Sequence, residues 1–133
     1  MRTVFLDTVG LLALWDRVDQ WHAAASAAFT ELNLAECRLV TSTYVLLECA
    51  NAAARKPYRS EVPRLRDQLG MAGDLFEPTV DEVQAAWAEY ANAAHARAGM
   101  IDLVSFTLMR RLEIQEAFTN DKHFSIAGFK VLF

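Results

Sequence analysis

The sequence predicts a three-layer α/β/α sandwich around a central parallel sheet of about five strands. Short, continuous apolar runs recur along the chain, and such runs are typical of strands that are buried on both faces of a sheet. Segments with helical periodicity separate them, and strands that alternate with helices form parallel βαβ units with right-handed crossovers. The 133 residues are 53% hydrophobic, which suits one core. Residues 1–133 are therefore expected to form a single domain.

The individual elements follow from the same two patterns. Strands are predicted at residues 4–6, 38–41, 75–77, 117–119 and 130–133. Helices are predicted at about residues 9–15, 20–34, 43–55 and 102–112, with a brief turn or helix at 121–127. A further helix has Pro63 in its first turn, where a missing amide costs little, and ends at Gly70 and Gly73. The helix at 102–112 is apolar almost all round and is expected to be buried.

Capping signals define the helix between the third and fourth strands. Thr79 and Glu82 have the spacing of a capping box, and Gly99 is predicted as the C-cap. A stripe at helical spacing predicts that the helix continues to about Arg97. The stripe consists of Val83, Trp87, Tyr90 and Ala94.

Composition excludes several classes of protein. The apolar runs are too short to cross a bilayer, and no signal peptide fits before the first strand, so a cytoplasmic protein without membrane contact is expected. Cys37 and Cys49 have neither a disulfide nor a zinc spacing. The net charge of −4 argues against a protein that grips nucleic acid by charge alone. Residues 51–70 are locally basic, with five cations against two acids.

Four acids do not fit the polar faces of the predicted helices. Asp7 and Asp121 follow predicted strands, and open α/β sheets bind ligands beyond the carboxyl ends of their strands. Glu48 lies within an apolar helical run, where an unpaired buried carboxylate is costly. Asp102 begins the buried helix. Helix caps for the aspartates and an ion pair across the fold for Glu48 are the structural alternatives.

A site built from carboxylates favours a hard cation. Mg²⁺ and Mn²⁺ prefer oxygen ligands, whereas zinc usually takes His or Cys. Such ions activate water against phosphate diesters. The sequence contains no Walker loop, GxGxxG fingerprint, nucleophile elbow or Ser–His–Asp order.

Polar neighbours of these acids are candidate supporting residues. Ser105 lies one helical turn beyond Asp102 and faces the same way. Thr119 is expected to hold the carboxylate of Asp121. Asn120 is expected to cap the following turn or to contact substrate, and His123 is expected to support the site rather than to bind metal.

The same residues resemble the PIN-domain family, and most closely the VapC-type toxins of prokaryotic toxin–antitoxin pairs. The similarity spans essentially the whole chain, and its most specific part is the Thr-x-Asp-x-His-Phe pattern. The matching segments are Val4-Phe5-Leu6-Asp7-Thr8, Glu48, Asp102-Leu103-Val104-Ser105-Phe106, Thr119-Asn120-Asp121-Lys122-His123-Phe124 and Gly128-Phe129.

The resemblance implies a Mg²⁺- or Mn²⁺-dependent endoribonuclease that cuts single-stranded or looped RNA. Its acidic quartet would be Asp7, Glu48, Asp102 and Asp121, with Ser105 and Thr119 at the common hydroxyl positions of the family. Thr8, next to Asp7, is a further candidate for supporting the site or contacting substrate. It further implies that the first and fourth strands are neighbours, that the protein is a homodimer, and that a small VapB-type antitoxin blocks the site. Five basic residues are candidates for contacts to flanking phosphates, although a solvated polar face is the preferred interpretation for each of them: Arg55, Lys56, Arg59, Arg110 and Arg111.

Other functions fit the sequence less well. A phosphatase of the haloacid-dehalogenase type needs a second Asp two residues after the first, and Val9 occupies that position. A receiver domain needs paired acids at the first strand. The main alternative is a PIN fold that serves as a binding or scaffold module without cleavage, which predicts no stabilisation by Mg²⁺ or Mn²⁺.

Overall fold

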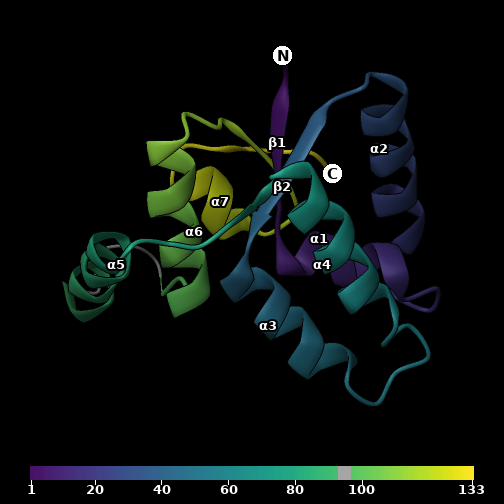
Figure 1. Ribbon diagram of the computed structural model, residues 1–133, viewed down its shortest axis with the longest axis horizontal. Helices are drawn as coiled ribbons and strands as arrows, with labels where there is room; N and C mark the ends of the chain where they lie inside the picture. Colours follow the sequence, from purple (N-terminus) through teal and green to yellow (C-terminus); the bar gives the residue numbers. More distant parts are fainter. Residues whose placement is uncertain (93–96) are drawn as a thin grey trace.

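A computed structural model describes residues 1–92 and 97–133 and has the predicted α/β/α architecture (Figure 1). Five strands form one parallel sheet in the order β3-β2-β1-β4-β5. Helices α1 to α4 lie on one side of β1 and β2, and α5 to α7 lie on the other. The strands are β1 (Thr3–Leu6), β2 (Arg38–Ser42), β3 (Leu75–Phe76), β4 (Glu116–Phe118) and β5 (Lys130–Val131). The helices are α1 (Thr8–Trp15), α2 (His22–Leu34), α3 (Thr43–Ala53), α4 (Glu61–Ala72), α5 (Val80–Asn92), α6 (Met100–Arg111) and α7 (Lys122–Ile126).

Strand β1 lies at the centre of the sheet, between β2 and β4. Phe5 pairs with Val40 on one side and with Ala117 on the other. Leu6 pairs with Phe118, so the residues that follow β1 and β4 leave the sheet side by side. The prediction that the first and fourth strands are neighbours in the sheet is therefore confirmed.

Helix α1 starts directly against the end of β4. A Cβ atom added at Gly10 would lie 2.0 Å from the carbonyl oxygen of Phe118. No side chain fits in that space, so glycine at this position allows the first turn of α1 to approach β4. This contact holds the residue between β1 and α1, Asp7, next to the end of β4.

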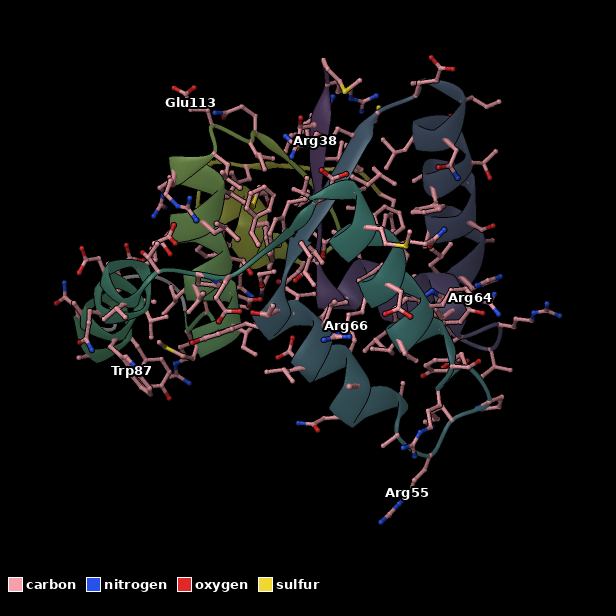
Figure 2. The ribbon with its side chains drawn as sticks, viewed as in Figure 1. Arg38, Arg55, Arg64, Arg66, Trp87 and Glu113 are labelled. Atoms are coloured by element: carbon pink, nitrogen blue, oxygen red, sulfur yellow. The ribbon has the colours of Figure 1, made fainter. Side chains whose placement is uncertain are left out.

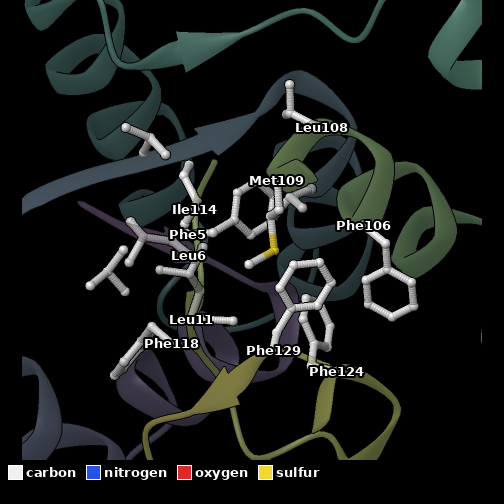
Figure 3. Packing of buried hydrophobic residues seen from close by; sticks show 14 of the residues in the cluster. Phe5, Leu6, Leu11, Phe106, Leu108, Met109, Ile114, Phe118, Phe124 and Phe129 are labelled. Carbon is white, nitrogen blue, oxygen red and sulfur yellow. The ribbon is translucent and has the colours of Figure 1, made fainter. Parts of the chain in front are cut away.

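The core fills both sides of the sheet, and Figure 3 shows the part that involves α6 and α7. The ring of Phe106 lies 4.9 Å from that of Phe124 and 5.6 Å from that of Phe129, measured between centroids. Helix α6 has six buried residues, which confirms the prediction of a buried helix. Cys49 is a buried core residue, and burial raises the pKa of its thiol to about 12, which makes it unreactive.

Helices α3 and α5 begin at side-chain caps, and the cap of α5 was predicted. Ser42 caps α3, because its hydroxyl accepts a hydrogen bond from the Val45 amide at 3.1 Å. The capping box of α5 is present in both directions: the Thr79 amide donates to Glu82 at 2.7 Å, and the Glu82 amide donates to the Thr79 hydroxyl at 3.1 Å.

The expectation for Gly99 was wrong, and the predicted end of the helix near Arg97 depends on residues outside those described. Gly99 is the N-cap of α6 and not a C-cap, with an extended backbone at φ −70°. Trp87 and Tyr90 are about half exposed, at 52% and 54%, and Figure 2 shows Trp87 at the periphery of the molecule. The buried face of α5 is instead formed by Glu82 and Ala86. Ala94 lies outside the described residues.

Length and hydropathy of the helices also bear on membrane contact. Within residues 1–92 and 97–133, no helix is both long enough and apolar enough to span a bilayer.

Candidate metal centre

The four acids lie on helices that begin at or near the carboxyl edge of the sheet. Asp7 is the N-cap of α1 directly after β1, and Asp121 is the N-cap of α7 shortly after β4. Asp102 lies in the first turn of α6, and Glu48 lies in the middle of α3. The capping alternative therefore holds for Asp7 and Asp121, but capping uses only part of each carboxylate.

Asp7 is almost completely buried, with 1% of its surface exposed. Its Oδ2 atom accepts hydrogen bonds from the Thr119 hydroxyl at 2.8 Å and from the Val9 amide at 3.3 Å. Its Oδ1 atom is buried and has no partner in the part of the chain that the structure describes. Burial, and then the negative charge of Asp102, raise the pKa of Asp7 to about 7.

Asp102 lies within the electrostatic reach of the other three acids. Burial, followed by the charges of Asp121 and Glu48, raises the pKa of Asp102 to about 6. Since Asp102 in turn raises the pKa of Asp7, all four carboxylates share one region. Like charges this close need a compensating cation or a proton.

Asp102, Asp121 and His123 lie close enough to share a metal ion. One ligand atom from each of these side chains lies within 4.8 Å of the others. The Nδ1 atom of His123 is 2.7 Å from Oδ1 of Asp121. The donor set is dominated by oxygen, and the unpaired Oδ1 of Asp7 adds a buried acceptor, so these residues fit a hard divalent cation.

Glu48 is less enclosed than its apolar sequence neighbours predict. Helix α3 has an exposed face, on which Leu47 is 64% exposed, and Glu48 itself is half-buried. Among the described residues, no cation lies within ion-pair distance of Glu48, so the expected alternative of a cross-fold ion pair is wrong. Glu48 therefore borders the group formed by Asp102, Asp121 and His123 without belonging to it.

The comparisons with known proteins agree with this geometry. The family model of the PIN domain matches residues 4–130. The chain belongs to the PIN-domain family. It is 28% identical over 127 residues, 95% of either chain, to the 23S rRNA-specific endonuclease VapC20 of Mycobacterium tuberculosis.

Two solved structures show the same fold. The crystal structure of M. tuberculosis VapC20, described as a sarcin-ricin loop cleaving toxin, superposes with a TM-score of 0.80 at 25% identity and covers 95% of both chains. FitAcB from Neisseria gonorrhoeae superposes with a TM-score of 0.65 at 17% identity and covers 98% of this chain and 96% of that chain. At the latter identity the likeness concerns the fold alone.

The hydroxyl neighbours in this PIN domain differ in part from expectation. Thr119 holds the carboxylate of Asp7 and not that of Asp121, whose backbone amide donates to the same Thr119 hydroxyl at 3.1 Å. Thr119 thus links the two aspartates that follow β1 and β4. The hydroxyl of Ser105 is buried without a partner among the described residues, and the buried hydroxyl of Thr8 lies next to the Cys49 thiol.

The residues after β4 also have clearer roles than the sequence indicated. Asp121, not Asn120, caps α7, because its Oδ1 accepts from the His123 amide at 2.9 Å. His123 was expected only to support the site, and its ring lies within ligand distance of two acids. Its spacing of two residues from Asp121, at the start of a short helix, was the available signal.

Two of the candidate phosphate contacts have other partners. Arg111 forms an ion pair with Glu82 at 2.8 Å, and Arg110 forms one with Glu89 at 3.5 Å. These pairs connect α6 to α5. Arg110 and Arg111 therefore contribute to helix packing, and a contact of either side chain with phosphate stays a prediction.

Proposed function

We propose that this PIN-domain protein is a metal-dependent endoribonuclease and the toxin of a VapBC-type toxin–antitoxin pair. The observation that carries the proposal is the shared electrostatic environment of Asp7, Glu48, Asp102 and Asp121 at one edge of the sheet. The similarity to the endonuclease VapC20 over 95% of both chains supports it.

The proposed metal is Mg²⁺ or Mn²⁺, held by Asp7, Asp102 and Asp121 with Glu48 nearby. When bound, the ion supplies an activated water and stabilises charge on the phosphate. Thr119 keeps the Asp7 carboxylate in one orientation through its hydroxyl, so that Oδ1 remains available. The helix N-termini at Thr8 and Lys122 add partial positive charge at the same edge.

The proposed substrate is single-stranded or looped RNA, and the sarcin-ricin loop of 23S rRNA is the first candidate because VapC20 is described as cleaving it. We also propose a VapB-type antitoxin that covers the acidic site, a homodimeric assembly, action in the cytoplasm, and a single domain over residues 1–133. The proposal of an antitoxin is supported by the description of VapC20 as a toxin.

Cleavage of RNA by the purified protein tests the proposal. A total RNA pool and an oligonucleotide of the sarcin-ricin loop are incubated with Mn²⁺, with Mg²⁺, or with EDTA. We expect fragments that need the metal and that are lost in Asp7→Asn but kept in Glu31→Gln, a matched carboxylate-to-amide change at an exposed position of α2.

Two outcomes would count against the nuclease. Fragments that persist in EDTA, or in Asp7→Asn, would remove the acidic site from the reaction. An absence of cleavage together with no change of melting temperature on addition of Mn²⁺ or Mg²⁺ would favour the scaffold alternative, since a formed metal site stabilises the native state.

A further inference from the structure

A pocket lies between the end of α1, the start of α2 and the α3–α4 connection, and none of the four acids of the metal centre lines it. Its volume is about 710 Å³, in the range of small-molecule and nucleotide sites. Two half-buried aromatic side chains line it, Trp15 from α1 and Tyr58 from the connection. Arg17 and Lys56, both exposed, stand at its rim.

The cations around this pocket lack carboxylate partners. Within the residues that the structure describes, the Lys and Arg side chains in ion pairs are Arg2, Arg38, Arg64, Arg66, Arg110, Arg111 and Lys130. In the same part of the chain, the Lys and Arg side chains outside ion pairs are Arg17, Arg55, Lys56, Arg59, Arg97 and Lys122. Four of these six lie in the two connections that border the pocket: Arg17 in the α1–α2 connection, and Arg55, Lys56 and Arg59 in the α3–α4 connection. Figure 2 shows Arg55 extending outward from the α3–α4 connection.

The acids near the pocket are engaged within their own segments. Asp16 accepts a hydrogen bond from the Val18 amide at 3.1 Å, and Asp19 accepts one from the Trp21 amide at 2.7 Å. Glu61 pairs with Arg64 on α4. Asp16 and Glu61 also line the pocket, so its lining holds two carboxylates beside Arg17 and Lys56. Neither Arg17 nor Lys56 forms an ion pair among the described residues, so both can contact an anionic ligand.

Aromatic surfaces bordered by cations bind single-stranded nucleic acid, because bases stack on the rings while cations contact the phosphates. We propose that this pocket binds an unpaired base of the RNA, stacked against Trp15 and Tyr58, with Arg17 and Lys56 on the adjoining phosphates. The inference rests on the proposed function in taking RNA as the ligand.

The distance between this pocket and the acidic centre suits two contacts on one strand. Asp7 caps the first turn of α1, and Trp15 ends that helix eight residues later. At 1.5 Å per residue the two positions are about 12 Å apart along the helix axis. A strand cut at the acidic edge would therefore reach the pocket by following α1, and the pocket would select substrates with an unpaired base at that distance.

Binding of a fluorescein-labelled single-stranded RNA of mixed sequence, measured by anisotropy in EDTA so that the RNA stays intact, tests the cations. We expect the double variant Arg17→Ala/Lys56→Ala to bind more weakly and to reduce the slope of log K against log salt by about 1.4, since each contact to a single strand contributes about 0.7. The matched control is Arg66→Ala/Lys130→Ala, which removes the same charge from exposed side chains whose partners, Asp67 and Glu116, are not part of the pocket lining, and it is expected to keep the wild-type slope. Figure 2 labels Arg66 on α4.

Stacking is tested by a readout that charge alone does not change. The protein has three tryptophans, at positions 15, 21 and 87, so Trp21→Phe/Trp87→Phe leaves Trp15 as the reporter. We expect RNA to quench its emission. Tyr58→Leu is expected to weaken RNA binding by about 5- to 150-fold, the range measured for loss of one stacked base, with its thermal unfolding recorded to verify the fold.

The outcomes separate this pocket from the nuclease proposal. The proposal that the pocket binds RNA would be overturned if Arg17→Ala/Lys56→Ala kept the wild-type affinity and salt slope. It would also be overturned if Trp15 emission did not change on RNA binding, and a peptide would then be the ligand to test. Such a result together with metal-dependent cleavage would leave the nuclease intact. RNA binding through the pocket without any metal-dependent cleavage would retain the pocket and refute the nuclease.

Discussion

Replacement of Asp7 by asparagine tests the physical basis of the acidic centre without relying on a substrate. Asparagine keeps the shape of the side chain, an acceptor for the Thr119 hydroxyl, and a good N-cap for α1. It removes the buried charge. Without metal, Asp7→Asn is therefore expected to be more stable than the wild type at neutral and alkaline pH.

The magnitude follows from the pKa of Asp7. Burial and the charge of Asp102 raise the pKa of Asp7 to about 7, whereas an unfolded Asp titrates near 3.9. Between these values the native state binds more protons than the unfolded state, so the free energy of unfolding of the wild type falls as pH rises. The advantage of the variant grows from about 1–2 kcal/mol at pH 5 to about 4 kcal/mol at pH 8, or on the order of 10 °C in melting temperature.

Thermal unfolding in EDTA at pH 5 and pH 8 measures this difference, with Glu31→Gln as the exposed control. Mn²⁺ or Mg²⁺ should then raise the melting temperature of the wild type more than that of Asp7→Asn, because the ion compensates a charge that the variant lacks. The reasoning from burial would be refuted if Asp7→Asn melted no higher than the wild type at pH 8. It would also be refuted if the difference in melting temperature between variant and wild type were the same at pH 5 and pH 8.

Three further predictions, two of them with a matched control substitution, test the packing and the caps of the fold. Gly10→Ala should destabilise the protein in urea unfolding by about 1–3 kcal/mol, because its Cβ meets the β4 backbone at 2.0 Å. Gly70→Ala, with no atom within 4 Å of the added Cβ, should gain about 0.5–1 kcal/mol; equal effects would contradict the close approach of α1. Thr119→Val should weaken Mn²⁺ binding by about 10- to 100-fold in calorimetry, since it frees the carboxylate of Asp7. Thr41→Val, which loses a buried hydrogen bond to a backbone carbonyl instead, should keep its Mn²⁺ affinity. Thr79→Ala should lower the free energy of unfolding by about 1 kcal/mol by removing the cap of α5, and an unchanged denaturation midpoint would contradict it.

Local chemistry explains why most of the fold was predictable. The apolar runs that form β1 and β2 read as buried strands because side chains on both faces of a parallel sheet are covered. The capping box at Thr79 and Glu82 is likewise a relation between neighbours in sequence. Asp7 and Asp121 stood out for a similar reason: each follows a strand in sequence, and strand ends mark the ligand edge of such sheets.

Solvent exposure was less predictable than periodicity. Trp87 and Tyr90 share a helical stripe with Val83, but α5 buries Glu82 and Ala86 instead. The reason lies in a partner outside the helix: Glu82 receives a bidentate pair of hydrogen bonds from Arg111 of α6, at 2.8 and 3.2 Å. A carboxylate satisfied in this way can face the neighbouring helix at little cost.

The sequence by itself determined the order of strands and helices along the chain and the identities of the acids, because periodicity, caps and strand ends depend on residues that are close in sequence. The tertiary structure decided which side chains meet. Thr119 orients Asp7, 112 positions away, because β4 lies beside β1 in the sheet. Glu48 borders Asp102 because α3 and α6 begin near the same edge. Such partnerships depend on strand order and helix packing, which bring distant segments together, and no local pattern contains them.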